Sequence, residues 1–179
     1  TSLSEILFER PLSIKSIEKG AFEQCSLLKQ ITIPCSLTMI TKRLFKSCLE
    51  LTEIIIPSSI TQIDDYAFSE CSLKQILIPS SITEIGVGCF SKCHLLKQVL
   101  FESPSSLTKI GSDSFSQCIS LTQISIPSSV DIIGDFAFSE CILLSKIYFE
   151  NPSKVNAFGK GSFYKCSSLT EIEIPSSVT

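Results

Sequence analysis

The 179-residue chain has no tryptophan, one histidine, one methionine and two asparagines. The only Asn-x-Ser triplet, at 151–153, has proline in the middle position, which N-glycosylation does not allow. No apolar run approaches the roughly 18 residues of a membrane-spanning helix, and the tightest cluster, Ile54-Ile55-Ile56, is expected to be a strand. We therefore expect no direct membrane insertion by this part of the chain.

Positive charge is also scarce. Fifteen lysine and arginine residues stand against 18 aspartate and glutamate residues, which gives a net charge of −3 and an isoelectric point near 5.2. This balance supplies no basic field for nucleic acid or an anionic membrane. Gly86-Val87-Gly88 lacks the following helix and lysine of a phosphate-binding loop. We predict no nucleic-acid partner.

What the chain does contain is one motif, repeated about every 23 residues and plainest at 111–133. Six complete units span 18–40, 41–63, 64–85, 86–110, 111–133 and 134–158, with partial units at 1–17 and 159–179. Each unit supplies one phenylalanine of a column: Phe22, Phe45, Phe68, Phe90, Phe115, Phe138 and Phe163. Each also supplies one leucine: Leu28, Leu51, Leu73, Leu96, Leu121, Leu144 and Leu169. We predict a single solenoid over 1–179, and because both ends fall inside a unit we expect a fragment of a longer chain.

An alternating segment follows each leucine, as in LTQISIP at 121–127, and its period of two predicts a short strand that proline ends. The inward pairs are Ile31/Ile33, Ile54/Ile56, Ile76/Ile78, Val99/Phe101, Ile124/Ile126, Ile147/Phe149 and Ile172/Ile174. A later apolar pair, such as Ile82 and Ile85, predicts a second short strand or extended arm. Glycines such as Gly111 then turn the chain, and A-F-x-x-C forms a single helical or 3₁₀ turn. Stacked units place the strands in parallel around a shared core.

Seven of the nine cysteines stand three residues after a repeat phenylalanine: Cys25, Cys48, Cys71, Cys93, Cys118, Cys141 and Cys166. None belongs to a C-x-x-C pair, so these spacings do not favour zinc. One position repeated in seven turns predicts a buried column of small apolar side chains, a role that suits free cysteine. We predict reduced thiols, although disulfides between neighbouring thiols remain an alternative.

Two complete units, 86–110 and 134–158, carry two extra residues after the strand, and the first partial unit has the same form at Phe8-Glu9-Arg10-Pro11. In each of these units the last strand residue is phenylalanine instead of isoleucine. We interpret the larger ring as filling the space beneath a bulged exit. The unit 64–85 is one residue short, and 41–63 has Thr41-Lys42-Arg43-Leu44 where others read G-x-x-A.

The pattern L-x-x-I-x-I-P-x-x-V-x-x-I-G-x-x-A-F-x-x-C, seen at 121–141 as LTQISIPSSVDIIGDFAFSEC, resembles the BspA-type leucine-rich repeats of anaerobic bacteria and parasitic protists. The resemblance covers nearly the whole chain. It implies a leucine-rich-repeat solenoid, mainly β, of the kind carried by cell-surface proteins implicated in adhesion to host cells, matrix or other microbes. The family carries no catalytic motif to transfer.

We identify no catalytic residues, no metal ligands and no cofactor site in the sequence. Cys93 and His94 are adjacent, but Cys93 belongs to the cysteine column, where a thiol nucleophile lacks both access and an oriented base. The Ser-Ser pairs after proline are turn formers. We predict that the chain is not an enzyme.

The candidate binding surface is the outward side of the concave strands, where two rows alternate with the buried residues. One row is Gln30, Glu53, Gln75, Gln98, Gln123, Lys146 and Glu171; the other is Thr32, Ile55, Leu77, Leu100, Ser125, Tyr148 and Glu173. The first row is either a recognition surface or a solvated face kept uniform by repeat duplication. The consecutive Ile55, Leu77 and Leu100 reflect either a partner site or β-propensity alone.

The inserted loops, at Glu9-Arg10, Glu102-Ser103 and Glu150-Asn151, are expected to form an acidic rim beside the apolar patch.

We predict a recognition or adhesion module, on the cell surface or secreted, that binds a protein or glycan, such as a host-cell or matrix component. The alternative is a cytoplasmic scaffold or signalling module using the same surface. Uncapped ends also predict dimers or end-to-end association.

Overall fold

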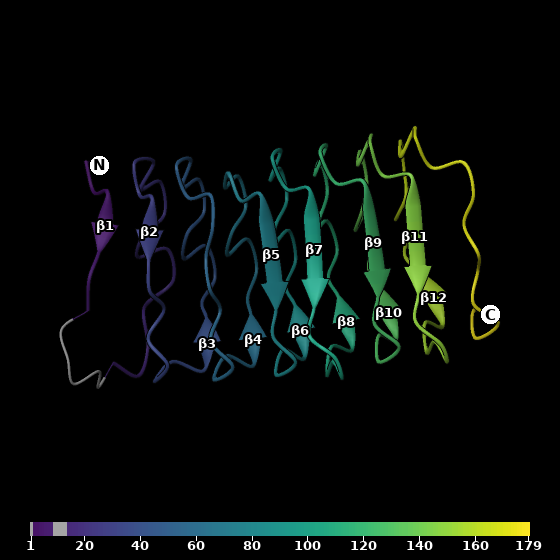
Figure 1. Ribbon diagram of the computed structural model, residues 1–179, viewed down its shortest axis with the longest axis horizontal. Helices are drawn as coiled ribbons and strands as arrows, with labels where there is room; N and C mark the ends of the chain where they lie inside the picture. The colour runs from purple at the N-terminus through teal and green to yellow at the C-terminus, as the bar shows by residue number, and fades with distance from the viewer. Residues whose placement is uncertain (1, 9–13) are drawn as a thin grey trace.

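The computed structural model describes residues 2–8 and 14–179. They form a parallel β-solenoid in which each repeat is one rung, and the two termini lie at opposite ends (Figure 1). Two rows of strands run in opposite directions, since each rung descends through a front strand and returns through a back strand (Figure 1). The front strands are β1 (Glu5–Ile6), β2 (Gln30–Ile31), β5 (Gln75–Ile78), β7 (Gln98–Phe101), β9 (Gln123–Ile126) and β11 (Lys146–Phe149). The back strands are β3 (Met39–Ile40), β4 (Gln62–Ile63), β6 (Glu84–Ile85), β8 (Lys109–Ile110), β10 (Ile132–Ile133) and β12 (Ala157–Phe158).

The back strands form one continuous parallel sheet in the order β12-β10-β8-β6-β4-β3. Each strand has only two residues, an outward one and an inward one, as in Glu84 and the buried Ile85 of β6. Neighbouring inward residues are in register, with Ile63 beside Ile85 and Ile85 beside Ile110. The expected second short strand is thus present.

Four of the front strands have four residues, but the front strands pair only two by two, as β1–β2, β5–β7 and β9–β11. The strand predicted at Ile54–Ile56 is wrong in one respect, because within the described residues this segment joins no ladder. The same holds for Ile172–Ile174 at the last rung. Ile54 and Ile56 are nevertheless buried while Ile55 is exposed. Alternation follows from burial of side chains, which does not require pairing between peptide groups.

The segment around each phenylalanine is a series of turns, and no helix or 3₁₀ helix occurs among the described residues. Its N–H groups alternate between two directions. The N–H of Phe115 donates to Ala137 of the next rung (2.8 Å), whereas that of Ser116 donates back to Asp113 (3.0 Å). Positive φ at Asp113 (54°) and Gln117 (60°) supports this alternation. The helical turn we expected is absent because half of the donors serve the neighbouring rung.

Glycine has a different role from the one predicted. Gly86, Gly111, Gly134 and Gly159 do not have the positive φ of turn glycines. A Cβ built on Gly134 would instead lie 2.5 Å from the Ser112 nitrogen, and one on Gly111 would lie 2.7 Å from the Gly86 carbonyl carbon. These glycines are therefore required by the close approach of successive rungs.

The core is a continuous stack of phenylalanine rings beside the cysteine column. Phe115 is fully buried, with ring centroids 5.3 Å from Phe90 and 5.4 Å from Phe138. Each thiol of the column from Cys48 onward donates to the phenylalanine carbonyl of the previous rung, as Cys118 does to Phe90 at 3.2 Å. All nine cysteines are free, and Cys35 is exposed. Burial raises the pKa of the Cys93 thiol to about 12, which removes thiolate character at neutral pH.

Candidate functional site

Both predicted rows lie on the solvent side of the front sheet. The predicted amide row is Gln30, Glu53, Gln75, Gln98, Gln123, Lys146 and Glu171, and the structure adds Glu5 at the first rung; all are exposed. The predicted outer row is Thr32, Ile55, Leu77, Leu100, Ser125, Tyr148 and Glu173, and the structure adds Leu7; all are exposed. The ladders align them, with Gln75 beside Gln98 and Leu77 beside Leu100. The predicted alternation is confirmed in β5 and β9, whereas at the last rung Ile174, which was expected to face inward, is 50% exposed.

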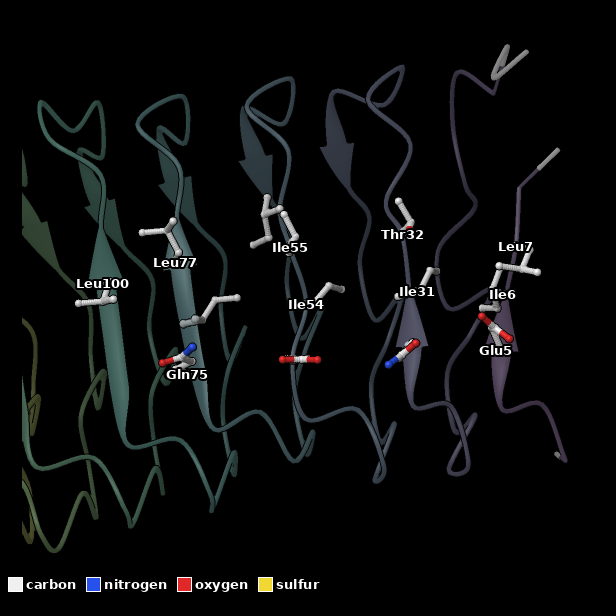
Figure 2. Close-up of a pocket in the computed structure, with 14 residues that line it drawn as sticks. Glu5, Ile6, Leu7, Ile31, Thr32, Ile54, Ile55, Gln75, Leu77 and Leu100 are labelled. Carbon is white, nitrogen blue, oxygen red and sulfur yellow. The ribbon is translucent and has the colours of Figure 1, made fainter. Parts of the chain in front are cut away.

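Part of this face is hollowed into a groove of about 500 Å³ that spans the first five rungs. Leu7, Thr32, Ile55, Leu77 and Leu100 follow one another along it, one from each rung (Figure 2). The exposed fractions are 85% for Ile55, 47% for Leu77 and 43% for Leu100. The groove thus presents apolar side chains to solvent at three successive rungs, where a strand face in contact with water usually carries polar ones.

The groove coincides with the interruption of the front ladder. Glu53 to Ile56 line it between β2 and β5, and within the described residues their peptide groups make no backbone hydrogen bond. Ile54 and Ile56 retain 9% and 6% exposure, against 1% for Ile76 and Ile78 in the laddered β5. Ile31 of the paired strand β2 is also 9% exposed, so this small exposure does not follow from the loss of pairing.

The charges near the groove are unevenly placed. Among the described residues that line it, Glu5 and Glu53 are the charged ones. Lys29, Lys74 and Lys97 stand one residue before the amide row and are exposed. The remainder of the amide row is neutral as far as Lys146, so the groove is an apolar surface bordered by amides with a few separated charges.

The predicted acidic rim has a structural role that the sequence did not reveal. Glu102 Oε2 accepts a hydrogen bond from the Ser80 N–H (3.0 Å), and Glu150 Oε2 accepts one from the Ser128 N–H (3.2 Å). Each glutamate therefore caps a backbone donor of the preceding rung. Ser103 and Asn151 are exposed beside them. The third loop, Glu9-Arg10, lies outside the described residues.

The inserted units are also the ones whose front strands end in phenylalanine. Phe101 and Phe149 are half-buried and pack against the core, and each directly precedes the glutamate of its loop. The Ser103–Pro104 and Asn151–Pro152 peptide bonds in these loops are cis.

A second exposed apolar set was missed from the sequence. Residues one or two positions after the column cysteines are exposed leucines or isoleucines in several units: Leu27, Leu49, Leu95, Ile142 and Leu143. The signal was available, since these residues lie between a buried cysteine and a buried leucine in each unit and are large apolar side chains outside the repeated inward columns. The set was overlooked because its position shifts by one residue between units.

Burial separates the adjacent Cys93 and His94, and the serine hydroxyls near the turns bind backbone carbonyls. His94 is exposed while its neighbour Cys93 is fully buried, so the two do not form a nucleophile and base. The Ser129 hydroxyl donates to the Leu107 carbonyl of the previous rung (2.7 Å). The part of the chain that the structure describes holds no cluster of three or more potential metal ligands. Nor does any helix there have the length and apolarity to span a membrane.

A β-solenoid with one buried leucine, one buried phenylalanine and two short strands per rung defines a leucine-rich-repeat protein. The family model for the BspA type leucine-rich repeat region matches in six copies over residues 1–97 and 100–179. The chain therefore belongs to the BspA-type leucine-rich-repeat family.

Solved bacterial structures agree with this assignment. A leucine-rich repeat protein from Bacteroides ovatus is 35% identical, with a TM-score of 0.88 over 99% of this chain and 44% of its own. The T. pallidum leucine-rich repeat protein is 31% identical, with a TM-score of 0.80 over 91% of this chain and 75% of its own. A leucine-rich cell surface protein from Faecalibacterium prausnitzii is 28% identical, with a TM-score of 0.55 over 89% of this chain and 51% of its own. The chain thus spans less than half of the B. ovatus protein. No curated protein matches the chain.

Proposed function

We propose that the chain is a non-enzymatic recognition module that binds a protein partner through the groove of its front face. The observation that carries this proposal is the run of Ile55, Leu77 and Leu100, exposed on three successive rungs of a protein whose repeating isoleucine and leucine columns are buried. A contiguous exposed apolar patch is the usual sign of an interaction surface. The amides that border the patch can fix a partner's orientation through hydrogen bonds.

A protein partner suits the groove better than a glycan. Among the described lining residues there is no aromatic ring on which a sugar could stack. Apolar side chains at successive rungs instead suit a row of apolar side chains from a polypeptide.

We also propose that the module acts at the cell surface. Membership in the BspA-type family and similarity to the F. prausnitzii cell surface protein support this location. An antibody raised against the purified chain should label intact cells of the source organism; labelling that requires permeabilised cells would overturn the proposed location.

Panning against random peptides tests the recognition surface. The purified chain is immobilised and panned against a phage-displayed library of random peptides, and enriched peptides are then measured against variants. Leu77→Glu and Leu100→Glu should abolish peptide binding, because each places a charge in the apolar patch. Ile132→Glu is the matched control, since Ile132 is similarly exposed (46%) but lies on the back sheet.

Unfolding midpoints of the three variants, measured in dilute solution so that any self-association does not contribute, should match that of the parent chain. If the groove variants bind the peptides as well as Ile132→Glu does, the groove is not the recognition surface. If Leu77→Glu lowers stability sharply, its side chain is not on the solvent face.

A further inference from the structure

The outer row of the front face has a symmetry that the repeat itself does not require. Read from the first rung to the seventh, it is Leu7, Thr32, Ile55, Leu77, Leu100, Ser125, Tyr148. In chemical terms the order is apolar, hydroxyl, apolar, apolar, apolar, hydroxyl, apolar, where Tyr148 offers an aromatic ring at the last place. These seven positions therefore form a palindrome centred on Leu77, and Glu173 of the eighth rung lies beyond it. An isologous dimer interface requires this property, because residue i of one copy must suit residue j of the other and the reverse.

A two-fold axis parallel to the front strands and passing beside Leu77 uses this palindrome. Such an axis keeps the strand direction and reverses the order of the rungs, so the outer row of one copy faces the outer row of the other. Leu77 then meets its own copy, Ile55 meets Leu100, Leu7 meets Tyr148, and Thr32 meets Ser125. Every apolar residue of the row faces an apolar one, and the two hydroxyls face each other across sheets about 10 Å apart.

The same two-fold rotation also pairs the residues of the amide row. Gln75 meets its own copy, Gln30 meets Gln123, and Glu53 meets Gln98, pairs in which an amide supplies the donor. The first and seventh rungs bring together Glu5 and Lys146, which have opposite charges. Lys146 is the one lysine of the amide row, and it stands at the position that the symmetry assigns to the partner of a glutamate.

One row works against this arrangement. Lys74 stands one residue before Gln75, so the axis brings it near its own copy. It is exposed at the edge of the face, where a lysine can extend its flexible stem and keep the ammonium group in water. The remaining lysines of that row, Lys29 and Lys97, face Thr122 and Thr52 and meet no like charge.

We propose that the partner of the groove is a second copy of this chain, seated face to face with the order of its rungs reversed about Leu77. This inference rests on the proposed function and names the partner for that surface. It differs from end-to-end association, which would use the terminal rungs and leave the front face free.

The first test is the mass of the purified chain in solution, by sedimentation velocity over a wide range of concentration. The parent chain should change from monomer to dimer as concentration rises. Leu77→Glu should raise the dissociation constant by about thirtyfold or more, because two carboxylates then face each other at the centre of an apolar patch. Ile132→Glu, on the back sheet, should dimerise like the parent.

Two results would overturn the proposal at this stage. One is a chain that stays monomeric at its highest soluble concentration. The other is a dimer that persists in Leu77→Glu, which would show that the copies meet through the ends or the back sheet.

Charge exchange tests the direction in which the copies lie. Lys146→Glu and Glu5→Lys should each weaken the dimer several-fold, because each places like charges opposite each other. The double variant, Glu5→Lys with Lys146→Glu, should restore the dimer. These two residues lie at opposite ends of the face of one chain, so their coupling is not expected within a monomer. If the double variant is as weak as the sum of the two single variants, the reversed register is wrong.

Cross-linking locates the axis. In a Cys35→Ser background, which removes the exposed cysteine, Leu77→Cys should be joined to its own copy by a bis-maleimide whose reach is about 10 Å. Ser125→Cys alone should remain uncoupled because it faces Thr32, whereas the double variant Thr32→Cys with Ser125→Cys should couple. Efficient coupling of Ser125→Cys alone would place the axis elsewhere.

The two proposals fail in different ways. If the chain is monomeric and Leu77→Glu no longer binds the panned peptides, the groove remains the recognition surface but its partner is not a second copy. If the chain dimerises but panning enriches no peptide, the front face binds only a second copy of this chain. If the chain is monomeric and no peptide is enriched by panning, the groove is not a binding site.

Discussion

The front and back sheets are built from the same repeats but join their rungs differently. The back sheet is continuous over six strands although each has only two residues, whereas the front strands have up to four residues but pair two by two. The turn segments connect the rungs as well, for example through Ser47 to Ser69 and Glu70 to Ser91. Because the turns and the back sheet link the rungs around Glu53–Ile56, the front ladder can lapse there without separating the stack.

The two sheets also differ in how their outward-facing side chains are arranged. Outward positions of the back sheet are mixed: β4, β6 and β8 carry the polar Gln62, Glu84 and Lys109, whereas β3, β10 and β12 carry Met39, Ile132 and Ala157. The front face differs because isoleucine and leucine occupy its outer row on three successive rungs, beside a groove where pairing is absent. Cohesion is concentrated in the core, the turns and the back sheet, which leaves the front face available for recognition. Four measurements test this division between cohesion and recognition.

The largest effect is expected in the core that both sheets share. Phe115→Ala removes a fully buried ring from the middle of the stack and should lower the free energy of unfolding by about 3–5 kcal/mol. Chemical denaturation measures this loss, and Leu77→Ala on the front face is the control, with an expected change within about 0.5 kcal/mol. Similar losses for both variants would mean that the front face carries as much stability as the core.

A smaller loss is expected where the turns approach each other. Gly134→Ala places a Cβ 2.5 Å from the Ser112 nitrogen, so the rungs must move apart at a cost of about 1–3 kcal/mol. Thr41→Ala is the matched control: Thr41 occupies the same column in a rung that already accommodates a side chain, and only its hydrogen bond to the Ile17 carbonyl (2.8 Å) is lost. Thermal unfolding compares the two. An unchanged midpoint for Gly134→Ala would show that the contact between rungs is looser than the structure indicates.

The cysteine column should contribute less per residue at neutral pH. Cys118→Ala removes the hydrogen bond to the Phe90 carbonyl and should cost about 1–2 kcal/mol. The column also predicts a pH dependence. Burial raises the pKa of Cys48 and Cys93 from 9.0 to about 12, so the unfolded chain loses these protons first and stability falls as pH rises from about 9 to 12.

Unfolding in urea between pH 8 and 11 checks that decline. A double variant, Cys48→Ala with Cys93→Ala, should show a shallower decline, since it lacks two of the thiols whose pKa burial raises. An equal slope in parent and double variant would contradict the assignment to the thiols.

The smallest effect concerns the rim of the front face. Glu102→Gln retains an acceptor oxygen for the Ser80 N–H, while Glu102→Ala removes it and should cost about 0.5–1 kcal/mol because the bond is exposed. The difference in unfolding free energy between the two variants isolates the cap. Equal stability of the Gln and Ala variants would return Glu102 to the role of a free acidic rim residue.

Much of the fold could be predicted because buried residues recur at fixed spacings along the sequence. The spacing of Phe115, Leu121, Ile124 and Ile126 identified the inward columns, and the positions between them identified Gln123 and Ser125 as outward. The failures concern backbone partners. The lapse at Ile54–Ile56 and the alternating donors around Phe115 depend on how peptide groups of neighbouring rungs align, and no residue type signals this directly.

The candidate site was predicted in the same uneven way. Ile55, Leu77 and Leu100 were recognised because their neighbours in sequence are buried. The hydrogen bond from the Ser80 N–H to Glu102 was not, because the two residues belong to different units and meet only when the rungs stack. The same limit hid the role of Gly134, whose neighbour is the Ser112 backbone.

The repeat, the buried columns and the family therefore follow from the order of the amino acids, since a side chain turns inward or outward according to its own polarity and its place in the period. Only the tertiary structure shows where the rungs pair, where they approach too closely for a Cβ and where the front face opens into a groove. Those properties depend on distances between units that lie about 23 residues apart. Such distances follow from the packing of whole rungs and not from any single residue.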